Sequence, residues 1–594
     1  MEHYRVNQKD ILFILKEQLN YGTLCSLDRY KDLNEKALDM VVTEAIKFAQ
    51  EVLDPLQAIG EQWGVQLKDG KVSCAPEFRE AFKQYCENGW LALASDTRYG
   101  GQEFPRMMDI VAHDFMDGAC QSFAMCPGLT LGAAHLIETF STEEYKELYI
   151  PRMLNGQWAG TMALTEPNSG SDLSDIKTVA FREGDHFKIK GTKIFISWGD
   201  HDVADNVIHL LLARIEGAPA GTRGISLFIV PKIRVKPDGS LGEANDVICE
   251  KVEEKLGIHA SPTCELSFGS HDGCIGYLCG QENKGLSAMF QMMNAARIGT
   301  GLSGLAIAST AYLNAVAYTK ERIQGPDITG QKKGQVPIIN HPDIRRMLLW
   351  MKAMVDGMRS MIYIGAMWLD LALESPDDAK KAHYMALVDF MTPIIKAYCS
   401  DMGFRVCETA MQCYGGYGFC KDYPIEQYLR DTKILSLYEG TNGIQALDLM
   451  GRKMRINDGA PVRAFMEEIG TFCKTNQDHP RLGGAVKELG QMVDKLMEVS
   501  TKMGMQAMSD LPQWASNTYP ALLSFGDATT CWMLLDLAVA AQKAIDGGKD
   551  NQFYQGKVMQ ALYFTRVTLP MAMARLDSCA REGREVVEMP AEAF

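Results

Sequence analysis

The spacing of apolar residues changes twice along this chain, and this change constrains the fold more than any other feature. Up to about residue 160 the apolar side chains recur every three or four positions, as on amphipathic helices. From about Trp158 to Glu282 they alternate or form short runs rich in β-formers, for example in HFKIKGTKIFIS at 186–197. The helical spacing then returns. We therefore expect helices, then strands, then helices.

Turn-rich breaks refine this pattern into four expected domains of a multidomain α+β fold. Residues 1–160 form a helical domain with an extra N-terminal helix, residues 161–281 a β-barrel or sandwich, residues 282–455 a four-helix bundle, and residues 456–594 an additional helical bundle. The length of 594 residues is too great for one hydrophobic core. The middle region lacks strand–helix alternation, which argues against a parallel nucleotide-binding sheet.

The charge balance restricts the class of partner. Lys and Arg number 60 against 75 Asp and Glu, which gives a net charge of -15 and argues against nucleic acid as a partner. The start MEHYRVNQKD lacks the basic and apolar regions of a secretory signal, and no apolar run reaches the length of a membrane span. We expect a cytoplasmic protein with no membrane span.

The cysteines give no sign of a metal centre. There are 16, at irregular spacings and without a CxxC pair. They are interpreted as reduced thiols that act as small apolar side chains. No metal site is expected.

The stretch LSLYEGTNGIQ, residues 435–445, places a single carboxylate, Glu439, on a Gly/Thr/Asn-rich turn between two helical segments. Loops held by a rigid scaffold are common positions for catalytic groups, and Glu can act as a general base. A solvated carboxylate in an inter-helix turn would look the same. The residue pattern alone leaves both interpretations open.

Five stretches resemble motifs of the acyl-CoA dehydrogenase family and occur in the family's order. They are MALTEPNSGSD at 162–172, KIFIS at 193–197, YTKERIQG at 318–325, QCYGGYGF at 412–419 and YEGTNGIQ at 438–445. A single Gly-rich turn would be common, but five motifs in register are specific. The extra N-terminal helix and the C-terminal bundle resemble the longer branch of the family, which includes 3-methylmercaptopropionyl-CoA dehydrogenases.

The resemblance implies FAD-dependent oxidation of an acyl-CoA thioester to the 2,3-enoyl-CoA. Glu439 would abstract the α-proton, flavin N5 would accept the β-hydride, and the backbone N–H of Glu439 would bind the thioester oxygen. The implied cofactor-binding residues are Met162, Leu164, Thr165, Phe195, Ser197, Arg322, Gln324, Gln412, Gly415, Gly416 and Thr441. The implied substrate-binding residues are Ser171, Arg297 and Gly440.

Simpler roles are open for several of these residues. Thr165 and Ser197 could satisfy local backbone at strand ends, and Arg322 could form a surface salt bridge. Arg297 could pair with a structural carboxylate. The family pattern also differs at three positions, where Phe195 replaces Trp, Gly325 replaces Phe, and Gly443 replaces Glu, Gln or Asn.

The resemblance further implies partners. Electrons would pass to an electron-transfer flavoprotein, and the turn at 412–416 would reach the FAD of a second subunit in a homodimer or dimer of dimers. The implied substrate is 3-methylmercaptopropionyl-CoA or a short- or medium-chain acyl-CoA. Two alternatives are an acyl-CoA oxidase that uses oxygen and a non-catalytic acyl-CoA-binding protein. The Gly/Pro-rich segment 325–340 is expected to be a lid or an exposed insertion.

Overall fold

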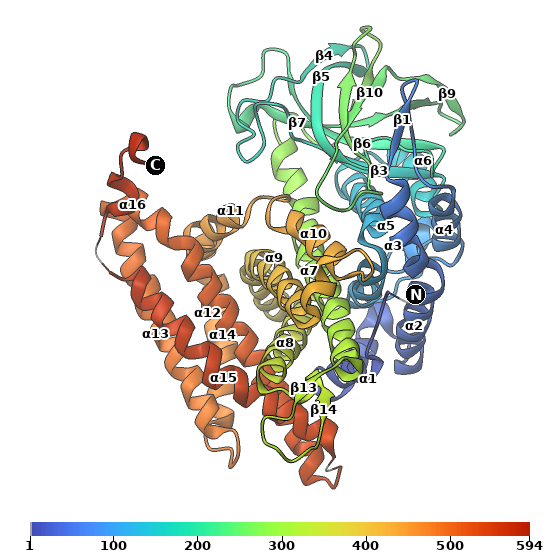
Figure 1. Ribbon diagram of the computed structural model, residues 1–594. Helices are drawn as coiled ribbons and strands as arrows, with labels where there is room; N and C mark the ends of the chain where they lie inside the picture. The colour runs from blue at the N-terminus through green and yellow to red at the C-terminus, as the bar shows by residue number, and fades with distance from the viewer. Residues whose placement is uncertain (1–2, 550, 582) are drawn as a thin grey trace. The chain divides into compact units, whose positions relative to one another are not determined.

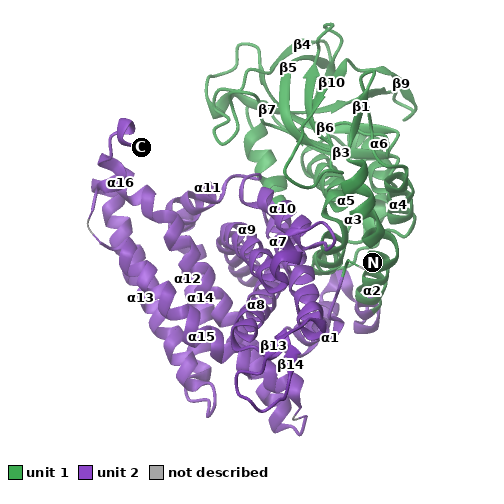
Figure 2. Ribbon diagram, viewed as in Figure 1, with its two compact units in different colours: residues 1–4, 40–296 green, residues 5–39, 297–594 purple. Residues whose placement is uncertain are grey.

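The computed structural model describes residues 3–549, 551–581 and 583–594, which form two compact units (Figures 1 and 2). Unit 1 comprises residues 40–296 together with the first residues of the chain, and unit 2 comprises residues 5–39 and 297–594. The boundary falls inside two helices, α2 (Glu35–Phe48) and α7 (Gly285–Glu321).

The N-terminal part of unit 1 is helical, as the apolar spacing predicts. After α2, the helices are α3 (Asp54–Trp63), α4 (Pro76–Glu87), α5 (Arg106–Phe140) and α6 (Glu143–Leu154). A short hairpin of β1 (Gln66–Lys68) and β2 (Lys71–Ser73) interrupts them, so the expectation of an all-helical domain is wrong at this point. Its Asp-Gly turn has φ values of 52° and 71°, which suit the tight turn of a two-residue hairpin.

The middle region is a β-barrel with flanking strands. Strand β4 pairs with both β5 and β6, so the pairings β5–β12, β12–β7, β7–β6, β6–β4 and β4–β5 close a circuit. Strands β11 and β10 extend it beside β5, and β3 lies beside β6. The bounds are β3 (Trp158–Ala163), β4 (Val179–Glu183), β5 (His186–Ser197), β6 (Asn206–Ile215), β7 (Ile225–Pro231), β10 (Val247–Val252), β11 (Thr263–Phe268) and β12 (Ile275–Leu278).

The pairings are antiparallel except for those of β6 with β3 and β4, which are parallel. Along β5, Phe187 and Ile189 are buried while Lys188 and Lys190 are exposed, as the period of two requires. A separate short pair, β8 (Ile233–Val235) and β9 (Leu241–Ala244), completes the strands of the described chain in this region.

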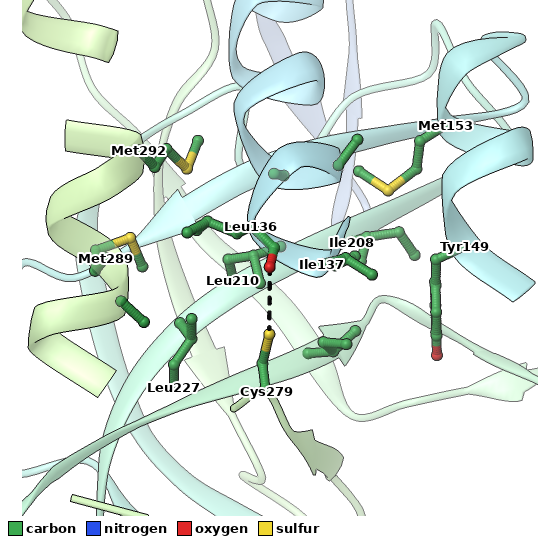
Figure 3. Packing of buried hydrophobic residues seen from close by; sticks show 14 of the residues in the cluster. Leu136, Ile137, Tyr149, Met153, Ile208, Leu210, Leu227, Cys279, Met289 and Met292 are labelled. Atoms are coloured by element: carbon green, nitrogen blue, oxygen red, sulfur yellow. Dashed lines mark hydrogen bonds between the residues drawn. The ribbon is translucent and has the colours of Figure 1, made fainter. Parts of the chain in front are cut away.

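One hydrophobic core of unit 1 joins its helices to the barrel. Side chains from α5 and α6 pack against β6 and β7 and against the start of α7 (Figure 3). Within this core the thiol of Cys279 donates to the carbonyl oxygen of Leu136 at 3.9 Å, so the cysteine packs as a small apolar residue with a weak donor.

The bundle in unit 2 is built around α7, α8 (Pro342–Glu374) and α9 (Asp378–Tyr414). Glycines allow α7 and α9 to approach closely. A Cβ on Gly301 would lie 2.5 Å from the carbonyl oxygen of Ile395, and a Cβ on Gly304 would lie 2.7 Å from that of Cys399. This contact fixes the register of the two helices, and it therefore positions the side chains that they carry toward the segment after α10 (Ile425–Lys433).

The remaining helices of unit 2 are α1 (Gln8–Leu12), α11 (Asn442–Leu447), α12 (Ile456–Asn476), α13 (Gly483–Ser509), α14 (Leu511–Asp546), α15 (Gln552–Cys579) and α16 (Glu585–Glu588). Among the described residues, α14 alone is long and apolar enough to cross a membrane, although no such span was expected. In its most apolar window 83% of the residues are buried, as in the core helix of a bundle.

Two turn-rich stretches of unit 2 contain regular structure. Segment 325–340 holds most of a hairpin formed by β13 (Ile323–Pro326) and β14 (Gln335–Pro337), and most of its residues are exposed, as expected for an exposed insertion; a role as a lid stays a prediction. The stretch RINDGAP at 455–461, where the third expected domain meets the fourth and the turn residues predict a linker, is instead the kinked start of α12, where Asn457, Asp458 and Gly459 have positive φ values. Asn, Asp and Gly are the residues that adopt this conformation most readily.

Candidate active site

Glu439 lies in a strained turn that joins α10 to α11. Its φ is 58° and that of Gly440 is 83°. For a residue with a side chain this left-handed conformation costs about 1–2 kcal/mol. The hydroxyl of Thr441 then caps α11 by accepting from the backbone N–H of Ile444 at 3.3 Å. The turn therefore presents the carboxylate at a helix N-terminus and not within a regular helix.

The surrounding side chains hold the backbone of this turn. Arg297 Nε on α7 donates to the carbonyl oxygen of Glu439 at 3.4 Å. The amide of Gln445 on α11 donates to the carbonyl oxygens of Glu439 and Gly440, at 3.3 Å each. These bonds come from two different helices, and they offset the conformational strain.

Arg297 has the structural role that its sequence position leaves open, and it also contacts the turn of the candidate base, while its contact with substrate stays a prediction. Its side chain is buried and lies 3.5 Å from the carboxylate of Asp448, which makes it a structural ion-pair partner. It also contacts the backbone of the candidate base. Burial lowers the pKa of Arg297, against the opposing effect of Asp448 and Glu439.

A second buried cation near the turn was missed by sequence reasoning. Lys396, in the middle of α9, is 0% exposed, and its Nζ donates to Asn442 Oδ1 at 2.8 Å. The available signal was a charged residue within an apolar helical stretch, MTPIIKAYC at 391–399. Such a lysine must find a polar partner inside the protein.

The electrostatics of the turn suit a general base. Glu439 is partly buried, and burial raises its pKa to about 7, while Arg297 and Lys396 act in the opposite direction. A carboxylate whose conjugate acid has a pKa of about 7 is a stronger base than the carboxylate of an exposed glutamate. The environment of Glu439 therefore favours the role of general base over that of a solvated carboxylate in an inter-helix turn.

The other cofactor-binding candidates of unit 2 are exposed. The guanidinium of Arg322 lies 5.9 Å from the ring centroid of Tyr417, beside the turn that contains Gly415 and Gly416. A Cβ on either glycine would meet no atom within 4 Å, so the backbone of this turn faces open space. Gln412 and Gln324 are exposed, and the carbonyl of Gln324 forms a hydrogen bond with His341 at 2.7 Å.

The candidates of unit 1 gather where β3 leads into a loop beside β5. Met162 lies in β3 and Leu164 follows it, and the carbonyl oxygen of Thr165 accepts from Ile194 N–H at 2.9 Å. Ser197 ends β5 opposite Thr263. The hydrogen bond to β5 thus brings the two motif stretches of this unit together.

Phe195 and Ser171 extend away from the core. Phe195 has a φ of 58° at a register shift of β5 and is 59% exposed, unusual for an aromatic residue within a strand. Ser171 is exposed on the loop. β-Bulges are common next to active sites, where they redirect a side chain, so this position is compatible with the flavin contact that the resemblance implies for Phe195.

A buried ion pair beneath this loop was also missed. Lys193 is fully buried and donates to the carboxylate of Glu166 at 2.8 Å and to the carbonyl of Leu164 at 2.9 Å. Glu166 also accepts from the backbone and hydroxyl of Thr178. Both charged residues belong to the motif stretches, and they anchor the loop that carries Thr165.

Family models match nearly the whole chain. They are described as "Acyl-CoA dehydrogenase, N-terminal domain" at residues 35–157, "Acyl-CoA dehydrogenase, middle domain" at 161–270, "Acyl-CoA dehydrogenase, C-terminal domain" at 283–454, and "Acetyl-CoA dehydrogenase C-terminal like" at 465–590. The last of these covers much of the extra C-terminal region.

Relatives and solved structures agree with this match. The chain is 35% identical to a Ruegeria pomeroyi "3-methylmercaptopropionyl-CoA dehydrogenase", over 95% of this chain and 96% of that protein. It is 36% identical to a Syntrophomonas wolfei "Butyryl-CoA dehydrogenase", over 100% and 99%. The fold resembles that of Caenorhabditis elegans ACDH-11 in complex with C11-CoA, with a TM-score of 0.77, 19% identity, and coverage of 95% and 93%. The chain therefore belongs to the acyl-CoA dehydrogenase family of oxidoreductases.

Proposed function

We propose that this protein oxidises a short acyl-CoA thioester to the 2,3-enoyl-CoA, with Glu439 as the base. The observation that carries the proposal is the partly buried carboxylate of Glu439, whose pKa is raised to about 7 on a turn held by Arg297 and Gln445. In the reaction the Cα–H bond breaks, its proton passes to a Glu439 carboxylate oxygen, and the β-carbon loses a hydride as the double bond forms.

The backbone around Glu439 supports the same chemistry. Enolate-like charge develops on the thioester oxygen as the α-proton leaves, and a backbone N–H is a suitable donor to it. Glu439 N–H belongs to a turn whose carbonyl oxygens are already bonded to Arg297 and Gln445. The turn therefore need not rearrange when the substrate arrives, which lowers the cost of stabilising the charge.

The residues of this chain fit FAD as the cofactor. A Cβ on Gly415 or Gly416 would meet only open space, so a large ligand can approach that backbone, and Arg322 nearby suits a diphosphate. In unit 1 the exposed Phe195 and the anchored loop at Thr165 offer an apolar ring and a hydroxyl to a flat ring system. Bound FAD would supply the acceptor for the β-hydride, which no side chain can provide.

The proposal also covers the substrate, the electron acceptor, the oligomeric state and the location of the protein. Relatives named for 3-methylmercaptopropionyl-CoA and butyryl-CoA support a short acyl chain as substrate. We extend the proposal to an electron-transfer flavoprotein as acceptor, a homodimer or dimer of dimers, and a cytoplasmic location. The intact Glu439 favours a dehydrogenase or oxidase over a non-catalytic binding protein.

Anaerobic reduction tests this function. The purified protein should be yellow, and a panel of straight, branched and thioether acyl-CoA compounds should bleach the flavin absorbance, fastest with the true substrate. Glu439→Gln should keep the colour and lose the bleaching. Unchanged bleaching in this variant would overturn the assignment of the base. Reoxidation by oxygen at the turnover rate would favour an oxidase, and reoxidation only by an electron-transfer flavoprotein would favour a dehydrogenase.

A further inference from the structure

Lys396 is a buried lysine whose position beside the catalytic turn the proposed chemistry does not yet use. The side chain is 0% exposed, and its Nζ donates to Asn442 Oδ1 at 2.8 Å. Asn442 is the first residue of α11 and follows Glu439 by three positions. Because the partner is a neutral amide oxygen, this hydrogen bond leaves the charge of the ammonium uncancelled.

Asn442 is tied to α9 through more than this one bond. Its Nδ2 donates to the carbonyl oxygen of Ala397 at 3.2 Å and to Ser400 Oγ at 3.1 Å. All these groups are buried within one turn of α9. The start of α11, and with it the short segment back to Glu439, is therefore fixed relative to α9.

The charged groups around Glu439 in unit 2 come from several elements. The positive charges of Arg297 on α7 and Lys396 on α9 both lower the pKa of Glu439. Asp401, one turn further along α9, raises the pKa of Lys396. After α11, Asp448 raises the pKa of Arg297 and Arg452 lowers it. Of the two cations facing the base, Arg297 is paired with Asp448 at 3.5 Å, whereas Lys396 bonds a neutral amide.

We propose that Lys396 is a positioning residue for Glu439: its ammonium group holds Asn442 at the start of α11, and its charge stabilises the carboxylate form of the base. The inference rests on the proposed function of Glu439. It adds a second residue that determines at which pH the base is competent.

The ionisation of the pair agrees with this geometry. Burial lowers the pKa of Lys396 to about 8, while Glu439 and Asp401 oppose the shift. Burial raises the pKa of Glu439 to about 7, and Lys396 is one of the two groups that oppose this rise. Loss of the ammonium should therefore raise the pKa of Glu439 further and move the onset of activity to higher pH.

Three variants separate charge from tethering. Lys396→Gln removes the charge but keeps an N–H donor for Asn442, Lys396→Arg keeps both charge and donor, and Asn442→Ala removes the tether but keeps the charge. In anaerobic flavin reduction at saturating acyl-CoA, Lys396→Gln should move the pH midpoint upward by about one unit. Lys396→Arg should restore the wild-type midpoint, and Asn442→Ala should slow reduction without moving the midpoint.

A readout independent of turnover uses infrared difference titration of the substrate-free protein from about pH 5 to about pH 9, a range that brackets the titration of a shifted carboxyl. The protonated-carboxyl band that disappears in Glu439→Gln reports Glu439, and its midpoint should move upward in Lys396→Gln. An unchanged midpoint in a folded Lys396→Gln variant would overturn the inference. If Lys396→Gln does not fold, a shifted midpoint of the Glu439 band in Lys396→Arg or Asn442→Ala would equally contradict the inference.

The proposed function fails by a different result. Flavin reduction that survives in Glu439→Gln would overturn the role of Glu439 as the base, while the infrared midpoint still reports the effect of Lys396.

Discussion

Arg297 Nε on α7 and the amide of Gln445 on α11 donate to the same main-chain carbonyl oxygen, that of Glu439, at 3.4 and 3.3 Å. A carbonyl oxygen has two lone pairs, so both donors can be accommodated. Neither of these two hydrogen bonds uses the carboxylate of Glu439. Arg297 thus acts on the base through its backbone and its charge.

Replacement of Arg297 tests whether this contact matters for the reaction. Arg297→Gln should slow anaerobic flavin reduction at least about tenfold, which corresponds to about 1.4 kcal/mol of lost stabilisation in the transition state. Arg297→Lys keeps the positive charge but not the planar donor geometry, so its flavin reduction rate should lie between those of the wild type and Arg297→Gln. Stopped-flow absorbance measures both rates. Wild-type reduction by a folded Arg297→Gln variant would show that Arg297 serves only as the ion-pair partner of Asp448.

A matched pair of glycine substitutions tests the conformation of the turn. Gly440 has a φ of 83°, and a Cβ there would lie 2.8 Å from Gln445 Nε2, so Gly440→Ala should displace Gln445 and reduce the flavin reduction rate sharply. Gly443 has ordinary helical geometry, and its Cβ would meet only Thr441 Oγ1 at 3.8 Å. Gly443→Ala should keep the rate and stabilise the protein by up to about 1 kcal/mol, because Ala favours a helix over Gly. Equal losses in both variants would refute this view of the turn.

The raised pKa of Glu439 predicts a pH-dependent effect on stability. The pKa is about 7 in the folded protein, whereas an unfolded glutamate has a pKa of about 4.3. Between these values the folded state binds more protons than the unfolded state, so the contribution of Glu439 to stability falls as pH rises. Glu439→Gln should therefore raise the unfolding temperature above pH 7, and this gain should vanish near pH 4. Calorimetry of both proteins across this range measures the difference. A gain that is constant with pH would contradict the assigned pKa shift.

The sequence was most informative where chemistry sits in short motifs. The turn at Glu439 stands out in the sequence as a Gly/Thr/Asn-rich break between helical segments, but its catalytic role, and the loop at Thr165 as a whole, are predicted from the resemblance of five motifs to the acyl-CoA dehydrogenase family. The period change likewise predicted β5 over His186–Ser197. The hairpin at 66–73 was missed, although its Asp-Gly pair was a readable signal, because a helical pattern surrounds it.

Tertiary partners were harder to predict. Lys396 lies between apolar neighbours in the sequence, and Lys193 lies in a strand that also carries Lys188 and Lys190. Each of the two binds a partner far along the chain, Lys396 at Asn442 and Lys193 at Glu166. A lysine in such a stretch is usually expected to extend its charged end to solvent. Which buried oxygen receives it depends on how strands and helices pack, and this information is absent from local spacing.

The buried pair under the loop at Thr165 supports a further prediction. Lys193→Met leaves the carboxylate of Glu166 in a buried position without its cation, which should cost about 3–5 kcal/mol of stability. The double variant Lys193→Met/Glu166→Gln removes the unpaired charge and should recover part of this loss. Urea unfolding of the two single variants and the double variant gives the coupling energy. Additive single effects would show that the two residues act independently.

The extra C-terminal region is joined to the rest of unit 2 by buried charges. Lys557 on α15 is 1% exposed and lies 2.6 Å from Asp10 on α1 and 2.7 Å from Asp356 on α8. Lys352 also contacts both carboxylates, at 3.3 and 3.4 Å, so loss of the Lys557 ammonium would leave two buried carboxylates to share this more distant cation.

Lys557→Met should therefore destabilise the protein by about 3–5 kcal/mol, as for a broken buried ion pair. The control lies in the same C-terminal region. Lys495 pairs with Asp577 at 2.7 Å, but both side chains are partly or largely exposed, so Lys495→Met should destabilise the protein far less than Lys557→Met. Urea unfolding followed by circular dichroism compares the two. Similar midpoints for the two variants would mean that the C-terminal helices are held by apolar packing alone, because removal of the buried charge would then cost no more than removal of an exposed one.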